Sequence, residues 1–528
     1  MNETVVGEKG MAVAPHRAAA ESAAEVMRAG GNAIEAMIAA AATIAVVYPQ
    51  MNSIGGDAFA LIAEPGRPVR FIDACGAAGS LATIEGYRKE GYDVLPARGP
   101  LAALTVAGAV SGWGQAMEAA ASLGGRLSRR DLLGGAIAHA REGVPVSPSQ
   151  WRKTVGNVDS LKDVPGFAAH FLADGKAPEI GTNWRQPRLA DTLEQLAHAG
   201  FDDFYRGDVS AEIAADLEEV GSPVTRADLR RHEARVREPL SLKLDDCTLF
   251  NAPPPTQGLA SLIILGLFDR LKVKRGESFD HIHGLLEATK RAFTVRDREV
   301  TDPAYGGDVK RFLDAGWLDQ EAETIDRRRA APWGGAEDGD TVYMAAVDGK
   351  GLAVSFIQST YWEWGSGVVL PRTGITWQNR GTSFSLDPNA VNPLKPGRKP
   401  FHTLNPAFAR FRDGRIMPYG SMGGDGQPQF QSAVFTRHVR FGMELGEAID
   451  APRWRLGRSW GADDVGVMLE NRFDPDLVAA LERAGHRVAL LPDAYSEALG
   501  HAGAIVRRPD GRLFGAADPR SDGAAIAV

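Results

Sequence analysis

Residues 340–356 read DTVYMAAVDGKGLAVSF, and this stretch decides the fold. Two strand-like runs, 341–347 and 352–357, flank the turn 348–351, so the pattern predicts a β-hairpin. The preceding residues, 327–340, are polar, rich in glycine and interrupted by a proline, which predicts an exposed, mobile loop. A loop that leads directly into a buried hairpin divides the chain into two parts.

The junction between Asp340 and Thr341 has two interpretations. In the first, it is an ordinary surface loop before a strand. In the second, the peptide bond before Thr341 is cut, which exposes an α-amine beside the threonine hydroxyl. An α-amine titrates near ~7.7–8.0 in short peptides and can take a proton at neutral pH, whereas a threonine hydroxyl is a weak nucleophile without such a base. Cleavage would therefore give Thr341 both a nucleophile and a base.

The composition excludes several classes of protein. The chain has 528 residues, which allows three or four domains, and its 44% apolar and 24% charged residues indicate a globular rather than a disordered protein. The net charge of −8, without a basic block, argues against binding to nucleic acid or to an anionic membrane. Cys75 and Cys247 are too few cysteines for a disulfide framework, which fits a reducing compartment.

Neither a signal peptide nor a membrane span is expected from the sequence. The first ten residues lack a basic region followed by an apolar stretch. The longest apolar segment, residues 33–47, contains Glu35 and is shorter than the ~20 residues that cross a bilayer. We therefore expect a cytoplasmic protein in which residues 33–47 form a buried helix.

The order of the elements predicts an α+β fold. Helical patterns such as residues 18–28, 130–142 and 187–199 dominate before residue 288, and strand patterns become frequent after residue 340. Residues 251–258, NAPPPTQG, interrupt the helical part of the chain. Their three consecutive prolines predict an extended segment at the wall of a pocket.

We expect neither a metal nor a cofactor. On a helix His281 and His283 point to different sides, and only His283 and Glu287 share a face. Two ligands are too few for zinc, so a core-facing or solvated helix is the better interpretation. Residues 420–425, GSMGGD, lack the Gly-Lys-Ser/Thr ending of a phosphate-binding loop and do not fit a dinucleotide fingerprint.

The glycine-rich segment 420–425 has another chemical interpretation. It follows a predicted strand and precedes a predicted helix, at residues 427–441. Consecutive glycines let backbone N–H groups approach a single ligand atom, as the stabilisation of an oxyanion requires. An ordinary tight turn is the alternative.

Eight short segments, in this order and spacing, resemble those of the gamma-glutamyltransferase family of N-terminal-nucleophile hydrolases. They are APHRAAAESAAEVMRAGGNAIEAMIAAAATIAVVYPQ (14–50), SIGGDAFALI (53–62), FYRG (204–207), NAPPPTQGL (251–259), DTVYMAAVDGKGLAVSF (340–356), GSMGGDGQP (420–428), APRW (451–454) and GAADPRS (515–521). The resemblance implies a four-layer αββα sandwich. It also implies that the chain cuts itself into a large subunit, 1–340, and a small subunit, 341–528, which together form one catalytic unit.

The resemblance also implies catalytic roles for particular residues. The cleavage site is the bond between Asp340 and Thr341, and Thr341 matches the nucleophile. Gly423 and Gly424 match the pair whose amides hold the oxyanion. Ser359, eighteen residues after Thr341, falls where the family has a threonine that hydrogen-bonds the nucleophile.

The substrate-binding residues depart from the family's pattern. His402 and Thr403 stand where the family has paired serines that contact the substrate carboxylate. Cys75 replaces the arginine that binds the glutamate carboxylate, and Ser383 replaces the acidic residue for the substrate α-amine. Tyr361 stands at a position that is usually asparagine. An unpaired carboxylate or ammonium is costly to desolvate, so we expect glutathione to bind poorly.

Arg380 and His402 lie in two segments that line the family's pocket, and Tyr361 adds aromatic bulk. The planar guanidinium of Arg380 suits bidentate binding of a carboxylate, with a surface arginine as the alternative. One cation in a small aromatic pocket predicts a short amide with one carboxylate, such as oxamate. The chain thus resembles the cytosolic branch of the family that includes oxamate amidohydrolase and gamma-glutamyltransferase-like proteins.

The leading hypothesis is a cofactor-free, self-processing amidohydrolase that acts through an acyl-threonine intermediate. One alternative is a gamma-glutamyl hydrolase or transferase with a rebuilt glutamate site. Another is an uncleaved, inactive relative with a binding or structural role. The expected partners are a small-molecule amide and the two subunits of the precursor, which could assemble as a homodimer of heterodimers.

Overall fold

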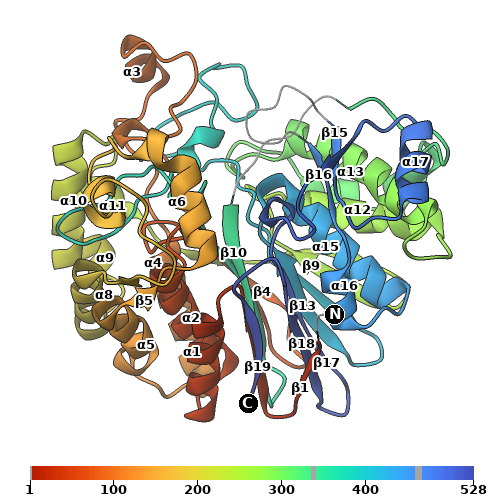
Figure 1. The fold of residues 1–528 in the computed structure, drawn as a ribbon, viewed down its shortest axis with the longest axis horizontal. Helices are drawn as coiled ribbons and strands as arrows, with labels where there is room; N and C mark the ends of the chain where they lie inside the picture. The colour runs from red at the N-terminus through yellow and green to blue at the C-terminus, as the bar shows by residue number, and fades with distance from the viewer. Residues whose placement is uncertain (1–2, 334–339, 458–465) are drawn as a thin grey trace.

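The computed structural model describes residues 3–333, 340–457 and 466–528. Two antiparallel seven-stranded sheets lie face to face between two layers of helices (Figure 1). Three buried clusters fill the spaces: one between each sheet and its helices, and one between the sheets. The predicted αββα sandwich is therefore confirmed.

Both sheets combine strands from the two parts of the chain. The first sheet has the order β1 (Val5–Gly7), β18 (Leu513–Ala517), β17 (Ala502–Arg507), β13 (Ile416–Ser421), β12 (Ala407–Phe411), β9 (Cys247–Asn251) and β8 (Leu240–Lys243). The second has the order β19 (Ala524–Ala527), β2 (Gly10–Ala14), β10 (Asp340–Asp348), β11 (Ala353–Tyr361), β3 (Asp57–Ala63), β4 (Arg70–Ala74) and β7 (Arg235–Arg237). Strands that precede and follow residue 340 thus pair directly with one another.

The predicted hairpin is β10 and β11, and it occupies the middle of the second sheet. Its alternate residues serve different layers, as the two-residue period of a strand dictates. Val342 and Met344 pack against the helices, whereas Tyr343 and Ala345 pack against the first sheet. Because both faces are covered, the strand that begins beside Thr341 is buried along its length.

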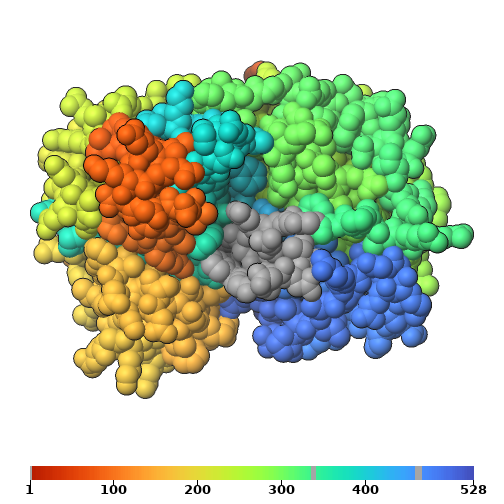
Figure 2. Space-filling view, turned by 90° about the horizontal axis from the view of Figure 1, so that it is seen from above, coloured from red at the N-terminus to blue at the C-terminus, as the bar shows by residue number. Residues whose placement is uncertain are grey.

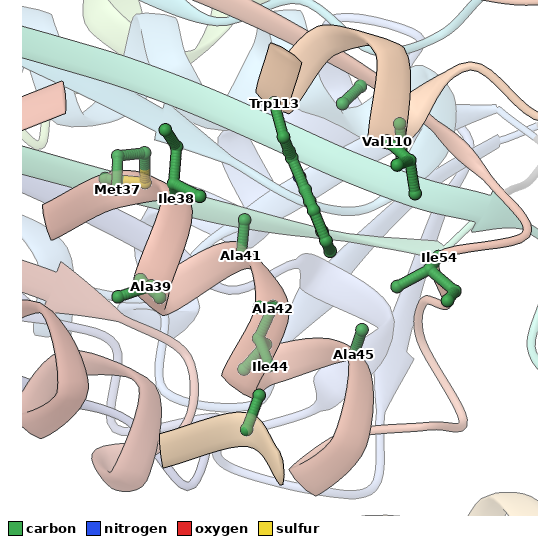
Figure 3. Packing of buried hydrophobic residues seen from close by; sticks show 14 of the residues in the cluster. Met37, Ile38, Ala39, Ala41, Ala42, Ile44, Ala45, Ile54, Val110 and Trp113 are labelled. Carbon is green, nitrogen blue, oxygen red and sulfur yellow. The ribbon is translucent and has the colours of Figure 1, made fainter. Parts of the chain in front are cut away.

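The helices over the second sheet come from the first part of the chain. The main ones are α1 (Arg17–Arg28), α2 (Ala33–Val47), α4 (Ala109–Ser122), α5 (Arg129–Glu142) and α8 (Pro187–Ala199). All fifteen residues of α2 are buried, and Trp113 of α4 packs into the same cluster (Figure 3). The buried Glu35 completes a capping box with Asn32 and accepts a hydrogen bond from the Leu127 amide at 2.8 Å. The helix predicted at 33–47 is confirmed.

Further elements complete this half of the molecule. They are α3 (Ile84–Lys89), α6 (Pro148–Leu161), α7 (Phe167–Phe171), α9 (Asp203–Arg206), α10 (Asp208–Val220), α11 (Arg226–Arg231) and the two-stranded β5 (Val144–Pro145) and β6 (Asn183–Trp184). Among the described residues, no helix is both long and apolar enough to cross a bilayer.

The opposite helical layer covers the first sheet. It contains α12 (Gly258–Leu271), α13 (Phe279–Glu299), α14 (Ala315–Glu323), α15 (Gln427–Phe435), α16 (Leu445–Asp450) and α17 (Pro475–Arg483), beside a small sheet of β14 (Trp454–Gly457), β15 (Gly466–Glu470) and β16 (Val488–Leu491). The helix predicted at 427–441 is α-helical only to Phe435 and continues as one π-helical turn, Thr436–Arg440.

The chain between the hairpin and β12 joins the two halves at the top of the molecule. Phe384, Leu386 and Leu394 pack against Tyr87 and its neighbours, while Thr301 Oγ1 donates to the Val391 carbonyl. Figure 2 shows part of this connecting segment, in cyan, between the orange and green parts of the surface.

The predicted exposed loop at 327–340 is only partly described. Residues 327–329 are exposed, in agreement with the prediction, and residues 334–339 lie outside the described residues.

Candidate active site

Thr341 lies at the start of β10 and is 1% exposed. Asp340 pairs with Tyr361 of β11 and Val342 pairs with Gln358, so two residues of β11 lie opposite Thr341 alone. This is a β-bulge whose extra residue is on β11, and a bulge bends the strand that carries it. Gln427 Nε2 donates a long hydrogen bond of 3.4 Å to Thr341 Oγ1, which links the threonine to the first residue of α15.

The end of β11 is shaped by a local hydrogen bond. Tyr361 has a φ of 86°, a conformation that bulky residues rarely adopt, and its N–H donates to Ser359 Oγ at 2.7 Å. Ser359 itself pairs with Asp57 of β3. Thr341, Ser359 and Tyr361 thus meet at one end of the central strands, and the contact expected between Ser359 and the nucleophile stays a prediction.

The predicted oxyanion loop, residues 420–427, runs from the last two residues of β13 to the first residue of α15. Gly423 has a φ of 114° and Gly424 a φ of 52°, both in the region that favours glycine. A Cβ at Gly423 would lie 2.7 Å from Phe430 Cε2, so a side chain does not fit. Gly420 has the same restriction, because its Cβ would lie 2.2 Å from the ring of Tyr343.

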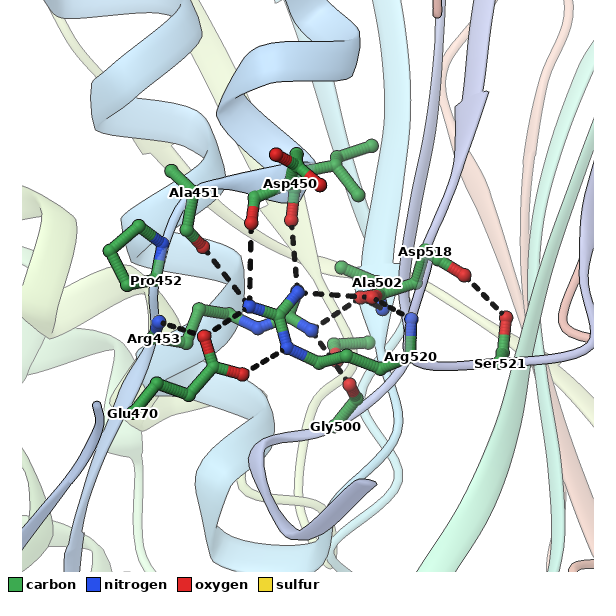
Figure 4. A network of polar contacts seen from close by, with 12 residues as sticks. Asp450, Ala451, Pro452, Arg453, Glu470, Gly500, Ala502, Asp518, Arg520 and Ser521 are labelled. Atoms are coloured by element: carbon green, nitrogen blue, oxygen red, sulfur yellow. Dashed lines mark hydrogen bonds and ion pairs between the residues drawn. The ribbon is translucent and has the colours of Figure 1, made fainter. Parts of the chain in front are cut away.

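A buried ion network, drawn in Figure 4, includes Gly500, which packs against this loop. Arg453 pairs with Asp518 and donates to the Gly500 carbonyl at 2.7 Å, while Arg520 pairs with Glu470 at 2.6 Å. The Gly500 Cα in turn lies 3.4 Å from the position of a Cβ at Gly423. The segments APRW and GAADPRS therefore form a support for the oxyanion loop.

Arg380 is 1% exposed, so the alternative of a surface arginine is wrong. Its Nη1 donates to Thr403 Oγ1 at 3.0 Å, and its guanidinium carbon lies 3.2 Å from the centroid of the Tyr361 ring. Nε and Nη2, which form one edge of the guanidinium, lack a hydrogen-bond partner among the described residues. Burial lowers the pKa of Arg380, and the proximity of Tyr361 and Asp57 acts in the opposite direction.

His402 is held by Asp57, with Nε2 at 3.1 Å from Asp57 Oδ2. The Leu404 amide points to Nδ1 at 3.5 Å, so Nδ1 accepts and Nε2 carries the proton. Burial, with the charges of Arg380 and Lys399, holds the pKa of His402 well below its ordinary value. His402 is therefore neutral at physiological pH.

Asp57 accepts hydrogen bonds from the Gly76 and Gly108 amides, each at 3.0 Å. Burial raises the pKa of Asp57 from 3.8 to about 7, although these amides, Gln378 and Arg380 all act in the opposite direction. Asp57 thus changes charge near neutral pH beside Arg380.

Cys75 is buried, and its thiol donates to Asp73 Oδ1 at 3.3 Å. Asp73 Oδ2 also pairs with Arg237 at 2.9 Å and with Lys399 at 3.0 Å. Burial raises the pKa of Cys75 well above its ordinary value, so the thiol is not ionised. Ser383, at the other altered position, donates to the Phe401 carbonyl at 2.9 Å.

Sequence reasoning missed Asp57, Gln257 and Gln427, although each lies inside a segment that carries the resemblance. The signal was present in SIGGDAFALI, NAPPPTQGL and GSMGGDGQP, where a polar residue follows small or apolar ones. Lys399 carried no such signal, because only the fold places it beside Asp73.

One cluster brings three potential metal ligands together. His283, Glu287 and His486 have ligand atoms within 4.8 Å of one another. From the sequence alone, only two of these three residues were considered as ligands. His283 Nδ1 and His486 Nε2 bond at 2.9 Å, and Lys290 Nζ donates to Glu287 Oε1 at 2.6 Å. Because the protein itself engages these atoms, we assign no metal to the cluster.

Comparisons with known proteins agree along the whole chain. A family model described as Gamma-glutamyltranspeptidase matches residues 19–528. The oxamate amidohydrolase proenzyme of Klebsiella pneumoniae is 53% identical over 529 residues, 99% of each chain. The glutathione hydrolase-like YwrD proenzyme of Bacillus subtilis is 39% identical over 533 residues, 100% of each chain. The crystal structure of cephalosporin acylase from Bacillus halodurans is 34% identical with a TM-score of 0.92, and the match covers 100% of this chain and 97% of that one.

These matches confirm the predicted resemblance and the interpretation as a self-processing amidohydrolase rather than an inactive relative. The αββα sandwich and the arrangement of Thr341 against a glycine-rich loop fit the same conclusion. The chain belongs to the gamma-glutamyltranspeptidase family.

Proposed function

We propose that the precursor is cut between Asp340 and Thr341 and that the mature protein hydrolyses oxamate or a closely similar small amide. The observation that carries the substrate assignment is the Nε–Nη2 edge of the buried Arg380, which has no hydrogen-bond partner within residues 3–333, 340–457 and 466–528. Such an edge matches the two oxygens of one carboxylate. The 53% identity to an oxamate amidohydrolase proenzyme supports the same substrate class.

The proposed chemistry uses Thr341 twice. After cleavage its α-amine takes the proton of its own hydroxyl, and Oγ1 attacks the amide carbon. The N–H groups of Gly423 and Gly424 stabilise the oxyanion that forms. The protonated α-amine then gives its proton to the amide nitrogen, the C–N bond breaks, and ammonia leaves an acyl ester on Thr341. Water then attacks the ester, so oxamate and water become oxalate and ammonia.

Arg380, Thr403 and Tyr361 are the proposed substrate-binding residues, because they form one contiguous contact. Neutral His402 adds polarity without a second charge. We infer that gamma-glutamyl compounds bind poorly, since Cys75 and Ser383 offer neither the cation nor the carboxylate that an amino-acid head group needs.

A gamma-glutamyl activity is the second candidate, and Lys399 is the observation that favours it. Its side chain is 24% exposed and lies 3.0 Å from Asp73, close to Cys75. Lys399 could bind a second carboxylate of the substrate, and it would then lose its ion pair with Asp73. The cytoplasmic location and the homodimer of heterodimers stay predictions.

Substrate specificity provides the test of the proposed function. We expect processed wild-type protein to release ammonia from oxamate with a kcat/KM several hundred-fold above that for gamma-glutamyl-p-nitroanilide, because each lost charged hydrogen bond costs about 1.5–3 kcal/mol. Arg380→Ala should raise KM for oxamate and leave self-cleavage intact.

Arg398→Ala is the matched control, since the side chain of this buried arginine bonds Thr301 Oγ1 at 2.8 Å and the Val391 carbonyl, neither of which is a proposed site residue. A higher kcat/KM for the glutamyl compound in wild-type protein would contradict the substrate assignment.

Maturation provides the second prediction. Thr341→Ala should remain a single band of 56.4 kDa on a denaturing gel and be inactive, because alanine has no hydroxyl to attack the preceding carbonyl. Thr341→Ser should retain the chemistry and yield two fragments. Two fragments from the alanine variant, with cleavage after Asp340, would show that another residue is the nucleophile.

Replacement of Gly423 tests the oxyanion loop. We expect Gly423→Val to lower kcat by about 10²–10³-fold, the cost of one lost oxyanion donor, because valine disfavours a φ of 114° and would strike Phe430. KM should change little. The measurement is steady-state ammonia release by protein already shown to be cleaved. A wild-type kcat in that sample would remove the loop from the mechanism.

The charge of Asp57 predicts that the KM for oxamate depends on pH. Its pKa of about 7 is raised from 3.8, so Asp57 is neutral below that pH and ionised above it. Ionised Asp57 offsets the charge of Arg380, and we expect KM for oxamate to rise about fivefold from pH 6 to pH 8, equivalent to about 1 kcal/mol. In Asp57→Asn the KM should stay level. The same rise in both proteins would assign it to another group.

A further inference from the structure

Gln257 connects the two halves of the proposed site. It precedes α12, is fully buried, and uses one amide nitrogen for two bonds. Its Nε2 donates to the Thr403 carbonyl at 2.8 Å and to the Gly424 carbonyl at 2.8 Å. Thr403 bonds Arg380, and Gly424 belongs to the oxyanion loop, so a single side chain bridges carboxylate binding and amide cleavage.

The orientation of the Gln257 amide is fixed by its neighbours. Two carbonyl oxygens can only accept, so the NH₂ group must face them. Arg296 can only donate, and its Nη1 lies 3.0 Å from Gln257 Oε1. Arg296 also pairs with Asp425 at 3.0 Å, which ties it to the oxyanion loop. Each hydrogen-bonding group of the amide therefore has a partner.

The backbone around Gln257 is also hydrogen-bonded to the substrate-binding segment at His402. The Gln257 N–H donates to the His402 carbonyl at 2.9 Å, and the His402 N–H donates to the Pro255 carbonyl at 2.9 Å. The Thr256 N–H donates to the Pro253 carbonyl, so the triple-proline segment turns rather than running extended as predicted. The turn brings Gln257 against the substrate-binding segment.

Gln431 shows what an ordinary buried glutamine does here. It is 1% exposed, and its Nε2 donates to the Asn405 carbonyl at 2.6 Å while its Oε1 accepts from Ser261. Its described contacts do not reach Gly423 or Gly424. The difference between the two glutamines is the bridge to Gly424, which only Gln257 makes.

We propose that Gln257 is a positioning residue that sets the separation between the carboxylate site at Arg380 and the oxyanion loop, and thereby selects substrates by length. In oxamate the carboxylate is bonded directly to the amide carbon, whereas in malonamate one methylene intervenes. A fixed separation favours one of these lengths. The inference rests on the proposed function, because it needs Arg380 to bind the substrate carboxylate.

The experiment compares wild-type protein with Gln257→Met, Gln257→Glu and the control Gln431→Met. Each protein is first shown to be cleaved on a denaturing gel, and kcat/KM is then measured for oxamate and malonamate. Met has a similar length but donates no hydrogen bond. Glu keeps the shape of Gln and presents oxygen to both carbonyls, so it provides the test if the Met variant does not fold.

We expect wild-type protein to prefer oxamate. Both Gln257 variants should lose about 10²-fold in kcat/KM for oxamate, the cost of a misplacement of about 1 Å, and the preference over malonamate should fall at least about tenfold. Gln431→Met should keep the wild-type preference within about twofold.

An unchanged preference in a folded, cleaved Gln257 variant would overturn the positioning role and leave the proposed function standing. An equal fall in Gln431→Met would also overturn it, because the effect would then belong to the core in general. If wild-type protein hydrolyses neither amide, the proposed function fails and the positioning role fails with it.

Discussion

The contact of Tyr343 with Gly420 is the constraint on which the site depends. Tyr343 lies two residues after Thr341, and Gly420 lies three residues before Gly423. A Cβ on Gly420 would lie 2.2 Å from the tyrosine ring, so only glycine lets the two sheets approach this closely. The tyrosine is 2% exposed and bonds Ser355 on the neighbouring strand at 3.1 Å. Packing between the sheets thereby sets the position of Thr341, the proposed nucleophile, relative to the loop proposed to stabilise the oxyanion.

Two further sets of contacts hold the 420–427 loop in place. Behind it, Arg453 and Asp518 form a fully buried pair, and the loss of one partner from such a pair leaves an uncompensated charge that costs several kcal/mol. At its side, Gln257 and Arg296 bond Gly424 and Asp425. These contacts restrict a loop whose glycines would otherwise allow many conformations. In the proposed mechanism, a rigid pair of N–H donors would need no reorganisation during the reaction.

The sequence predicted what depends on local patterns and left open what depends on the meeting of distant segments. The hairpin, α2 and the α+β composition followed from periodicity and turn residues, and the layer order came from the family resemblance. The burial of Arg380 could not be read from its neighbours, because it arises from Tyr361 and Thr403 folding over it. Asp57 and His402 are 345 positions apart, and their bond exists only because the fold places the start of β3 beside His402.

The interleaving of strands from both parts of the chain has a consequence for the stability of the cleaved protein. In the second sheet β2 lies between β19 and β10, and in the first sheet β9 pairs with β12, so each sheet joins strands from both sides of residue 340. A cut at that point would produce two chains that stay associated, because dissociation would break strand pairing in both sheets. Refolding of the cut form would then be a second-order process that requires two chains to meet. The mature protein would owe its persistence to the slowness of unfolding rather than to a reversible equilibrium.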